Sequence, residues 1–322
     1  MSQEIVTVLM PVYNAERYLR ETLTSVSAQT LDQFEILVVD DGSTDRSAEI
    51  LEDYRAHEPR LRILRQPNGG ISAALNAGLR AAKGTLIARM DADDLMFPQR
   101  LERQRDFLAA HPELGFCASF MEMIDATGRT FGEYCPGPLT TADLQRQMAL
   151  RQAITYTHPT VMYRTALVRR LGGYDPSYEP CEDMELFGRM ILSGFPGLVI
   201  PEKLLKYRVH RASISGSKAA LQVRIQDYVR RAFYARLTGD SPLSRTEFER
   251  QIASLPIVQR LVYESDVWFR AYRQMATYCR AERRWAELLT CLTAAALLRP
   301  RKGLRYAAAM ATRVTRTATA SR

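Results

Sequence analysis

Three carboxylates within four residues, Asp91, Asp93 and Asp94, directly follow the apolar run Leu86–Met90. Asp is a poor strand residue and is rarely buried without a partner, so such a cluster at the end of a strand needs a chemical reason. Carboxylate oxygens are hard ligands that suit Mg²⁺ or Mn²⁺, ions that also bind substrate phosphates. The alternative is a solvated turn between strand and helix, in which Asp94 helps to cap the helix that follows Pro98. A D-x-D pattern alone favours this plainer interpretation.

A second acidic pair, Glu182 and Asp183, begins a stretch with the apolar spacing of a helix. Acidic residues are favoured in the first turn of a helix, which is the structural explanation for the pair. The chemical explanation is a general base that takes a proton from an attacking hydroxyl. Two carboxylates acting as nucleophile and acid would indicate a retaining hydrolase instead. Nothing else in the sequence indicates hydrolysis.

The elements that position these residues alternate between strands and helices. Apolar runs predict four strands, at Val6–Met10, Phe34–Val39, Leu61–Leu64 and Leu86–Met90. Helical patterns separate them, which indicates a parallel sheet with both faces covered. We expect Asn14 to cap the first of these helices.

Ligands bind outside the carboxyl ends of the strands in such sheets. Three of these ends carry polar or turn residues, at Pro11–Asn14, Asp40–Gly42 and Asp91–Asp94. Their convergence predicts a nucleotide and metal site. No G-x-G-x-x-G follows the first strand and no G-x-x-x-x-G-K-[ST] occurs, which argues against a dinucleotide fold and a P-loop.

The middle of the chain predicts further elements. These are a helix at Arg100–Ala110, a strand over 115–124 that leads into a hairpin at Asp125–Gly128, a helix at 140–152 and a strand at Thr157–Met162. His158 in the last strand has two interpretations of similar weight, a contact with substrate and a structural role.

Composition is that of a soluble globular protein, with 46% hydrophobic and 25% charged residues in 322. The five cysteines share no C-x-x-C spacing, which favours free thiols in a reducing compartment over a structural zinc site. The start does not resemble a signal peptide, and no apolar run is long enough to span a membrane. We therefore expect a cytoplasmic location.

Charge is distributed unevenly along the chain. Residues 219–322 hold 19 basic and 8 acidic residues, a balance of +11, whereas residues 1–218 have a balance of −3. Helices are predicted at 219–238, 245–254, 256–280, 282–298 and 303–318. From Arg299 onward there are seven basic residues and no acidic one. This segment predicts peripheral contact with an anionic membrane, and a soluble basic tail is the alternative. No repeat is evident, and charge alone does not indicate nucleic acid.

Four segments resemble, in the same order, those of glycosyltransferase family 2: VTVLMPVYNAERYLRETLTSVSAQT, EILVVDDGSTDRSAEIL, NGGISAALNAGLRAAKGTLIARMDADD and GGYDPSYEPCEDMELFGRM. The resemblance covers residues 5–215. It implies an α/β protein of the GT-A fold, with a Rossmann-like, mixed but mostly parallel sheet flanked by helices. The domains expected are a catalytic domain at 1–218 and a basic helical C-terminal region at 219–322.

The resemblance also implies a nucleotide pocket. Its expected residues are Pro11, Val12, Tyr13, Glu16, Asp41, Asn68, Gly70, Asn76 and Asp91. Asp41 would accept a hydrogen bond from the base, because uracil and thymine offer an N3–H donor. Leu75 stands where many relatives carry Arg, so no base-binding arginine is expected there. Asp45 is interpreted as a helix cap.

The remaining roles follow from the same resemblance. Asp93, Asp91 and His210 would hold Mn²⁺ or Mg²⁺, and Arg208 and Arg211 would bind diphosphate in a closing loop. Asp183 would be the base of an inverting transfer, oriented by Glu182. The donor would be a nucleotide sugar, most simply a UDP sugar. The acceptor would be a glycan or lipid-linked hydroxyl in cell-surface polysaccharide synthesis, and the location the cytoplasm or the inner face of its membrane.

Two alternatives stay open at this point. One is a nucleotide-sugar-binding homologue without catalysis, against which the intact Asp93 and Asp183 argue. The other is a sugar nucleotidyltransferase, which would carry a glycine-rich basic loop after the first strand, where this chain has Pro11–Asn14.

Overall fold

A computed structural model describes residues 5–135, 137–210 and 218–319, with the side chains of the last helix described as far as Ala309. The strands are β1 (Val6–Val12), β2 (Phe34–Asp40), β3 (Leu61–Arg65), β4 (Leu86–Arg89), β5 (Leu95–Met96), β6 (Phe116–Ile124), β7 (Thr130–Tyr134), β8 (Met162–Arg164) and β9 (Gly197–Arg208). The helices before β9 are α1 (Leu19–Ser27), α2 (Ser47–Arg55), α3 (Ile71–Ala81), α4 (Arg100–Ala110), α5 (Thr141–Ala149), α6 (Thr165–Arg170) and α7 (Glu182–Leu192), with the 3₁₀ turns η1 (His158–Thr160) and η2 (Pro176–Tyr178). The helices after it are α9 (Ala219–Leu237), α10 (Arg245–Ala253), α11 (Ile257–Ala281), α12 (Trp285–Leu298) and α13 (Pro300–Thr319).

The strands form one mixed sheet in the order β3-β2-β1-β4-β8-β6-β9-β5, with β7 paired to β6. Strands β1 to β4 are parallel, with Val12 of β1 opposite Asp40 of β2 and Leu9 of β1 opposite Arg89 of β4. Strand β8 runs antiparallel to both β4 and β6. The predicted parallel half of the sheet is confirmed. Its register places the ends of β1, β2 and β4 side by side, as the site requires.

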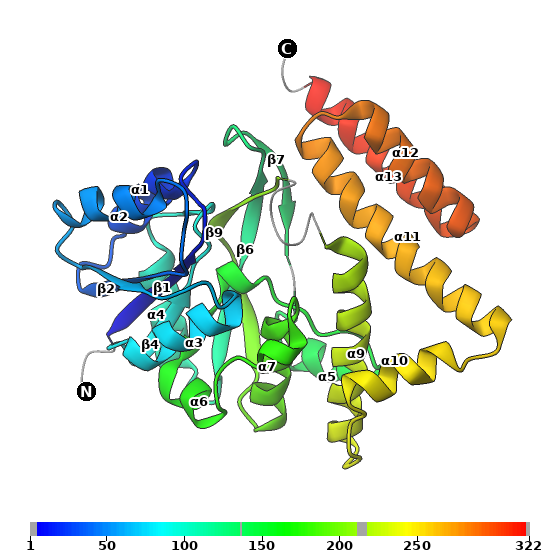
Figure 1. Cartoon of the computed structure of the whole chain (residues 1–322), viewed down its shortest axis with the longest axis horizontal. Coiled ribbons are helices and arrows are strands. Elements are labelled where there is room, and N and C mark those ends of the chain that lie inside the picture. The colour runs from blue at the N-terminus through cyan, green and yellow to red at the C-terminus, as the bar shows by residue number, and fades with distance from the viewer. Residues whose placement is uncertain (1–4, 136, 211–217, 320–322) are drawn as a thin grey trace. The chain divides into compact units, whose positions relative to one another are not determined.

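Both faces of the parallel half are covered, with α1 and α2 on one side and α3 on the other (Figure 1). Val8 and Met10 of β1 pack with Leu23 of α1 in the main core. The intervening Leu9 faces α3, where Gly78 allows close approach: a Cβ at Gly78 would lie 2.1 Å from a methyl carbon of Leu9. The alternation of buried side chains along β1 therefore fixes which helix covers which face.

Two local predictions were wrong. Asn14 does not cap a helix, because α1 begins at Leu19, and the Asn14 side chain accepts a hydrogen bond from the backbone N–H of Thr44 at 2.8 Å. The predicted strand at Thr157–Met162 is mostly the 3₁₀ turn η1, and strand pairing starts only at Met162. Pro159 explains the difference, since its fixed φ and missing N–H disfavour a central strand.

The chain divides into two compact units. The first contains Met1–Met123 and Gly132–Arg208, and the second contains Ile124–Phe131 and Val209–Arg322. In the second unit, α11, α12 and α13 pack around a small apolar core that includes Ala276, Cys279, Leu288 and Cys291. No helix in the described part of the chain is both long and apolar enough to cross a membrane.

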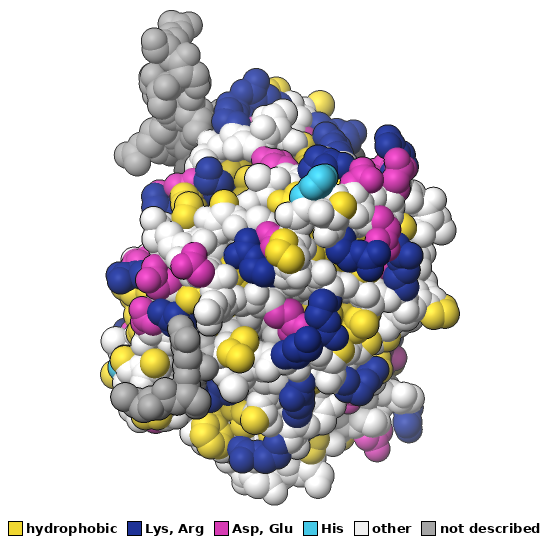
Figure 2. All heavy atoms as spheres, turned by 90° about the vertical axis from the view of Figure 1, so that its left-hand side faces the viewer, with side chains coloured by type: hydrophobic (Ala, Val, Ile, Leu, Met, Phe, Trp, Pro, Cys, Tyr) yellow, Lys and Arg dark blue, Asp and Glu magenta, His cyan; other side chains and the backbone are white. Residues whose placement is uncertain are grey.

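Charged side chains of both signs are distributed over the visible face of the first unit (Figure 2). On the face seen in Figure 2, acidic and basic side chains are intermingled and apolar ones are scattered. Three ion pairs at this end of the sheet join Arg20 to Asp53, Arg46 to Glu49 and Arg65 to Glu52. Such exposed pairs contribute little to stability but keep a surface soluble.

Candidate active site

The acidic cluster lies in the turn between β4 and β5. Carboxylate oxygens of Asp91, Asp93 and Asp94 lie within 4.8 Å of one another. Asp94 is completely buried, and one of its oxygens accepts a hydrogen bond from the backbone N–H of Arg208 at 2.7 Å. The expected role of Asp94 at the start of α4 was therefore wrong: its partner is the last residue of β9, far along the chain. Burial and the charges of Asp93 and Asp91 raise the pKa of Asp94 well above its usual value.

Three buried arginines, Arg89, Arg100 and Arg208, surround this turn. Arg89 is ion-paired with Asp91. Arg100 donates a hydrogen bond to the carbonyl of Arg89, the last residue of β4, at 2.8 Å. This bond helps to fix the end of β4, where the acidic turn begins. The sequence reasoning missed Arg89 and Arg100. The signal was present, because an arginine is almost never fully buried unless it is paired, and Arg89 ends an apolar strand pattern.

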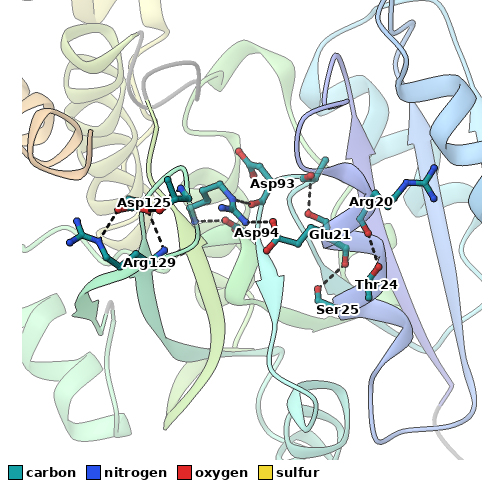
Figure 3. A network of polar contacts seen from close by, with 12 residues as sticks. Arg20, Glu21, Thr24, Ser25, Asp93, Asp94, Asp125 and Arg129 are labelled. Carbon is teal, nitrogen blue, oxygen red and sulfur yellow. Dashed lines mark hydrogen bonds and ion pairs between the residues drawn. The ribbon is translucent and has the colours of Figure 1, made fainter. Parts of the chain in front are cut away.

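Arg208 contacts the acidic turn with both its backbone and its side chain. Its guanidinium donates hydrogen bonds to the carbonyl oxygen of Asp93 at 2.7 Å and to the Glu21 carboxylate at 2.8 Å, and it stacks on the ring of Tyr18. Figure 3 shows Glu21, Asp93 and Asp94 gathered around this network. The expectation that Arg208 binds diphosphate from a closing loop was wrong. Its side chain is buried and already has three partners, so it positions the turn.

Asp41 connects the end of β2 to the turn before α3. Its two carboxylate oxygens accept hydrogen bonds from the backbone N–H groups of Gly69 and Gly70, both at 2.9 Å, and from the side chain of Gln66 at 2.7 Å. Asn68 is exposed in the same turn. Each carboxylate oxygen can accept more than one hydrogen bond. The contact of Asp41 with a nucleobase therefore stays a prediction.

The loop after β1 is joined reciprocally to the loop after β2. The backbone N–H of Glu16 donates to the Asp45 carboxylate at 3.0 Å, and the Glu16 carboxylate accepts from the backbone N–H of Arg46 at 3.0 Å. Asp45 also accepts from the backbone N–H of Ser47, the first residue of α2, but the N-cap of α2 is Arg46, so the expectation that Asp45 is the helix cap was wrong. Pro11 and Val12 lie at the base of this double loop, and Tyr13 is exposed at its tip.

Asn76 has a different role from the nucleotide contact that the sequence predicted. Its side-chain amide donates to the carbonyl of Tyr174 at 2.7 Å and accepts from the N–H of Tyr174 at 2.8 Å. Gly173, with a φ of +77°, makes this clamp possible, since a Cβ there would lie 2.3 Å from the Asn76 oxygen. The clamp anchors the segment that leads into α7.

The acidic pair at the start of α7 is sheltered from water. Glu182 is buried, and one of its oxygens has no hydrogen-bond partner among the described residues. Burial raises the pKa of Asp183 to about 6, and burial together with the charge of Asp183 raises the pKa of Glu182 to about 8. The Arg89 charge opposes both shifts. One carboxylate is thus poised to exchange a proton near neutral pH while its neighbour stays protonated.

Three further residues that the sequence singled out are His158, His210 and Arg211. His158 is buried, and its Nε2 lies 2.9 Å from the hydroxyl oxygen of Tyr174, which favours its structural interpretation. Burial lowers its pKa well below the usual value. His210 belongs to the second unit, and its role as a metal ligand stays a prediction. Arg211 lies outside the described residues.

The arrangement is the carboxyl edge of an α/β sheet with an acidic turn and the acidic pair Glu182–Asp183 at the start of α7. The sequence profile described as glycosyl transferase family 2 matches residues 7–172, more than half of the chain. The chain belongs to glycosyl transferase family 2. A curated family relative is the amylovoran biosynthesis glycosyltransferase AmsE of Erwinia amylovora, 30% identical over 205 residues that cover 63% of this chain and 75% of AmsE.

Solved structures show the fold of this family 2 chain. TarS residues 1–349 of S. aureus, in complex with UDP-GlcNAc, match with a TM-score of 0.57 at 19% identity, covering 90% of this chain and 89% of that one. The mannosyltransferase PcManGT of Pyrobaculum calidifontis, in complex with GDP-Man and Mn²⁺, matches with a TM-score of 0.57 at 20% identity, covering 98% and 88%. The GT-A fold expected from the sequence is confirmed.

Proposed function

We propose that the chain is a metal-dependent, inverting glycosyltransferase that moves a sugar from a nucleotide-sugar donor to a hydroxyl of a glycan or lipid-linked acceptor. The observation that supports it best is the pairing of two acidic sites with different surroundings. One is the carboxylate turn at the strand ends, in which Asp91 and Asp93 are partly exposed. The other is the sheltered pair Glu182–Asp183 at the start of α7.

The acidic turn fits a divalent cation. The carboxylates of Asp91, Asp93 and Asp94 are hard ligands, and one oxygen of each lies within 4.8 Å of the others, which is close enough for one ion to contact more than one of them. The second oxygen of Asp94 is buried without a hydrogen-bond partner in the described structure. Asp93 and Asp91 would hold the ion, and Asp94 offers a third carboxylate. When bound, the ion would neutralise the negative charge that develops on the leaving diphosphate.

Asp183 is proposed as the base that takes the acceptor's proton. It is less buried than Glu182, which gives the attacking hydroxyl access to its carboxylate. Its pKa of about 6 leaves it ionised at pH 7 but still basic enough to accept a proton. Glu182, with a pKa of about 8, is protonated there and can donate a hydrogen bond that orients base or acceptor. Direct attack by the hydroxyl opposite the leaving group inverts the anomeric carbon without a covalent intermediate.

The donor is proposed to be a UDP sugar. The Asp41 carboxylate, fixed by the Gly69 and Gly70 amides, presents an acceptor that matches the N3–H of uracil. TarS in its complex with UDP-GlcNAc supports this choice, and PcManGT with GDP-Man makes a guanine nucleotide the competitor to test. AmsE supports an acceptor in polysaccharide synthesis.

The test is a panel of UDP, GDP and dTDP sugars, measured by thermal stabilisation with Mn²⁺ and with EDTA. We expect the UDP series to raise the melting temperature only when the metal is present. Asp93→Asn should remove this stabilisation and donor turnover, and Asp53→Asn, an exposed carboxylate on α2, is the matched control. Unchanged metal-dependent turnover in Asp93→Asn would refute the metal role. Stabilisation by GDP sugars alone would refute the UDP assignment.

A further inference from the structure

Six large apolar side chains of the second unit are exposed at one end of its helical bundle. Ile257, Val258, Leu261 and Val262 occupy the first turns of α11, Leu297 lies near the end of α12, and Leu304 lies in the first turns of α13; each is between 50% and 77% exposed. Single exposed apolar residues are ordinary, but several gathered at one end of a helical bundle indicate an interaction surface. We refer to these six residues as the bundle-end surface.

Contacts between the helices show that these residues share one end of the bundle. The Arg299 guanidinium, between α12 and α13, donates a hydrogen bond to the carbonyl of Val262 at 3.0 Å. The Ser265 hydroxyl donates to the carbonyl of Leu298 at 2.9 Å. Both contacts join the second and third turns of α11 to the α12–α13 junction, and in Figure 1 the first turns of α11 extend beyond this junction toward α10.

The charge beside the bundle-end surface is positive. Arg301, Lys302 and Arg305 are exposed in the first turns of α13, and they enter no ion pair within the described part of the chain. The acidic residues nearby are already paired. Glu264 is paired with Arg224, and Asp266 is paired with Arg270. The three basic side chains on α13 are therefore not neutralised by a described acidic residue, and their charges can attract an external anionic partner.

We propose that the bundle-end surface docks the enzyme on an anionic lipid bilayer. A bilayer of this kind offers an apolar layer beneath negative headgroups, and it matches exposed apolar residues flanked by unpaired cations. A second copy of the chain is a poorer match, because pairing this surface with itself would bring together two sets of like charges. The surface is wider than the basic tail from Arg299 that the sequence indicated. It adds the start of α11, which carries four of the six apolar side chains.

Cosedimentation of the full chain with vesicles tests this docking. We expect binding to phosphatidylglycerol vesicles, little binding to phosphatidylcholine vesicles, and weaker binding at high salt. The triple variant Arg301→Gln, Lys302→Gln, Arg305→Gln should lower the partition coefficient on the order of 100-fold at low salt, since each basic residue near an anionic surface strengthens binding about fivefold. The apolar variant Ile257→Gln, Leu261→Gln, Leu304→Gln should weaken binding at every salt concentration.

Controls separate the surface from general charge and from catalysis. Arg20→Gln, Arg103→Gln, Arg146→Gln removes three exposed charges from the first unit and Leu150→Gln removes an exposed leucine there; both should bind as the wild type does. All variants should keep vesicle-free donor turnover, so that loss of docking is distinguished from failure of the proposed reaction. Wild-type protein that stays in the supernatant, or bundle-end variants that bind unchanged, would overturn the proposal. A wild-type dimer that the apolar variant dissociates would also overturn it, in favour of self-association.

Discussion

The two carboxylates at the start of α7 differ in their surroundings, and this difference predicts different effects of mutation. Asp183→Asn should lower kcat by about 10²- to 10⁴-fold, because the general base is lost while the donor pocket is untouched. Glu182→Gln keeps a neutral hydrogen-bonding group and should cost much less. Initial rates and calorimetric donor affinity measure the two effects separately. If Glu182→Gln lowered kcat more than Asp183→Asn does, Glu182 would be the base and Asp183 the orienting residue.

The shifted pKa of Asp183 predicts an acid limb in the rate profile. A base must be deprotonated to act, so kcat/KM for the acceptor should fall about tenfold per pH unit below a pKa of about 6. Glu182→Gln should leave this limb in place, because the pKa of Glu182 is about 8 and the residue is already neutral at pH 6. Rates measured from pH 4.5 to 8 provide the check. A flat profile down to pH 4.5 would show that the base has an ordinary carboxylate pKa, near 4.

Residue types predicted which side chains gather at the strand ends, but not which partners they take. Asp94 and Arg208 lie 114 positions apart, and Asn76 and Tyr174 lie 98 apart. No local pattern encodes a hydrogen bond across such a separation. Arg208 and Asn76 therefore looked like ligand-binding residues, although their groups serve the protein's own backbone. Residue type and position did predict that the carboxylates of Asp91, Asp93 and Asp94 lie together at the end of β4.

The segment from α6 to α7 carries the proposed base, and two adjacent glycines test how it is held. Gly172 and Gly173 both have positive φ, but a Cβ at Gly172 would meet nothing within 4 Å, whereas one at Gly173 would strike Asn76. Gly172→Ala should cost about 1 kcal/mol of unfolding free energy from backbone strain. Gly173→Ala should cost about 2 kcal/mol more, because it also breaks the Asn76–Tyr174 clamp.

The kinetic consequence of these two substitutions separates stability from positioning. Gly173→Ala should lower kcat at a temperature where the protein stays folded, and Gly172→Ala should not. Urea denaturation and initial rates measure both. Equal stability and equal rates in the two variants would mean that the clamp does not position α7.

At the scale of elements, apolar periodicity was sufficient for the four parallel strands and for α9 to α13. After α4 it also found β6 and α5, but it failed at Thr157–Met162. The residues around Pro159 have the apolar composition of a strand, yet they form a 3₁₀ turn. The two-residue strand β5, which pairs with β9, is too short to show any period. Pairing of distant segments decides such elements, and composition does not reveal it.

At the scale of the molecule, the acidic turn and the acidic pair on α7 lie in one unit and the basic helices in the other. Donor binding should therefore protect the first unit from hydrogen exchange. At a hundred times the dissociation constant, a ligand stabilises the bound state by about 2.7 kcal/mol, which slows exchange on the order of 100-fold. Donor with Mn²⁺ should slow exchange at residues 11–16, 66–70 and 91–94 and leave α11–α13 unchanged, as mass spectrometry can measure. Asp93→Asn should show no metal-dependent protection. Protection confined to α9–α13 would place the donor in the wrong unit and contradict the proposed site.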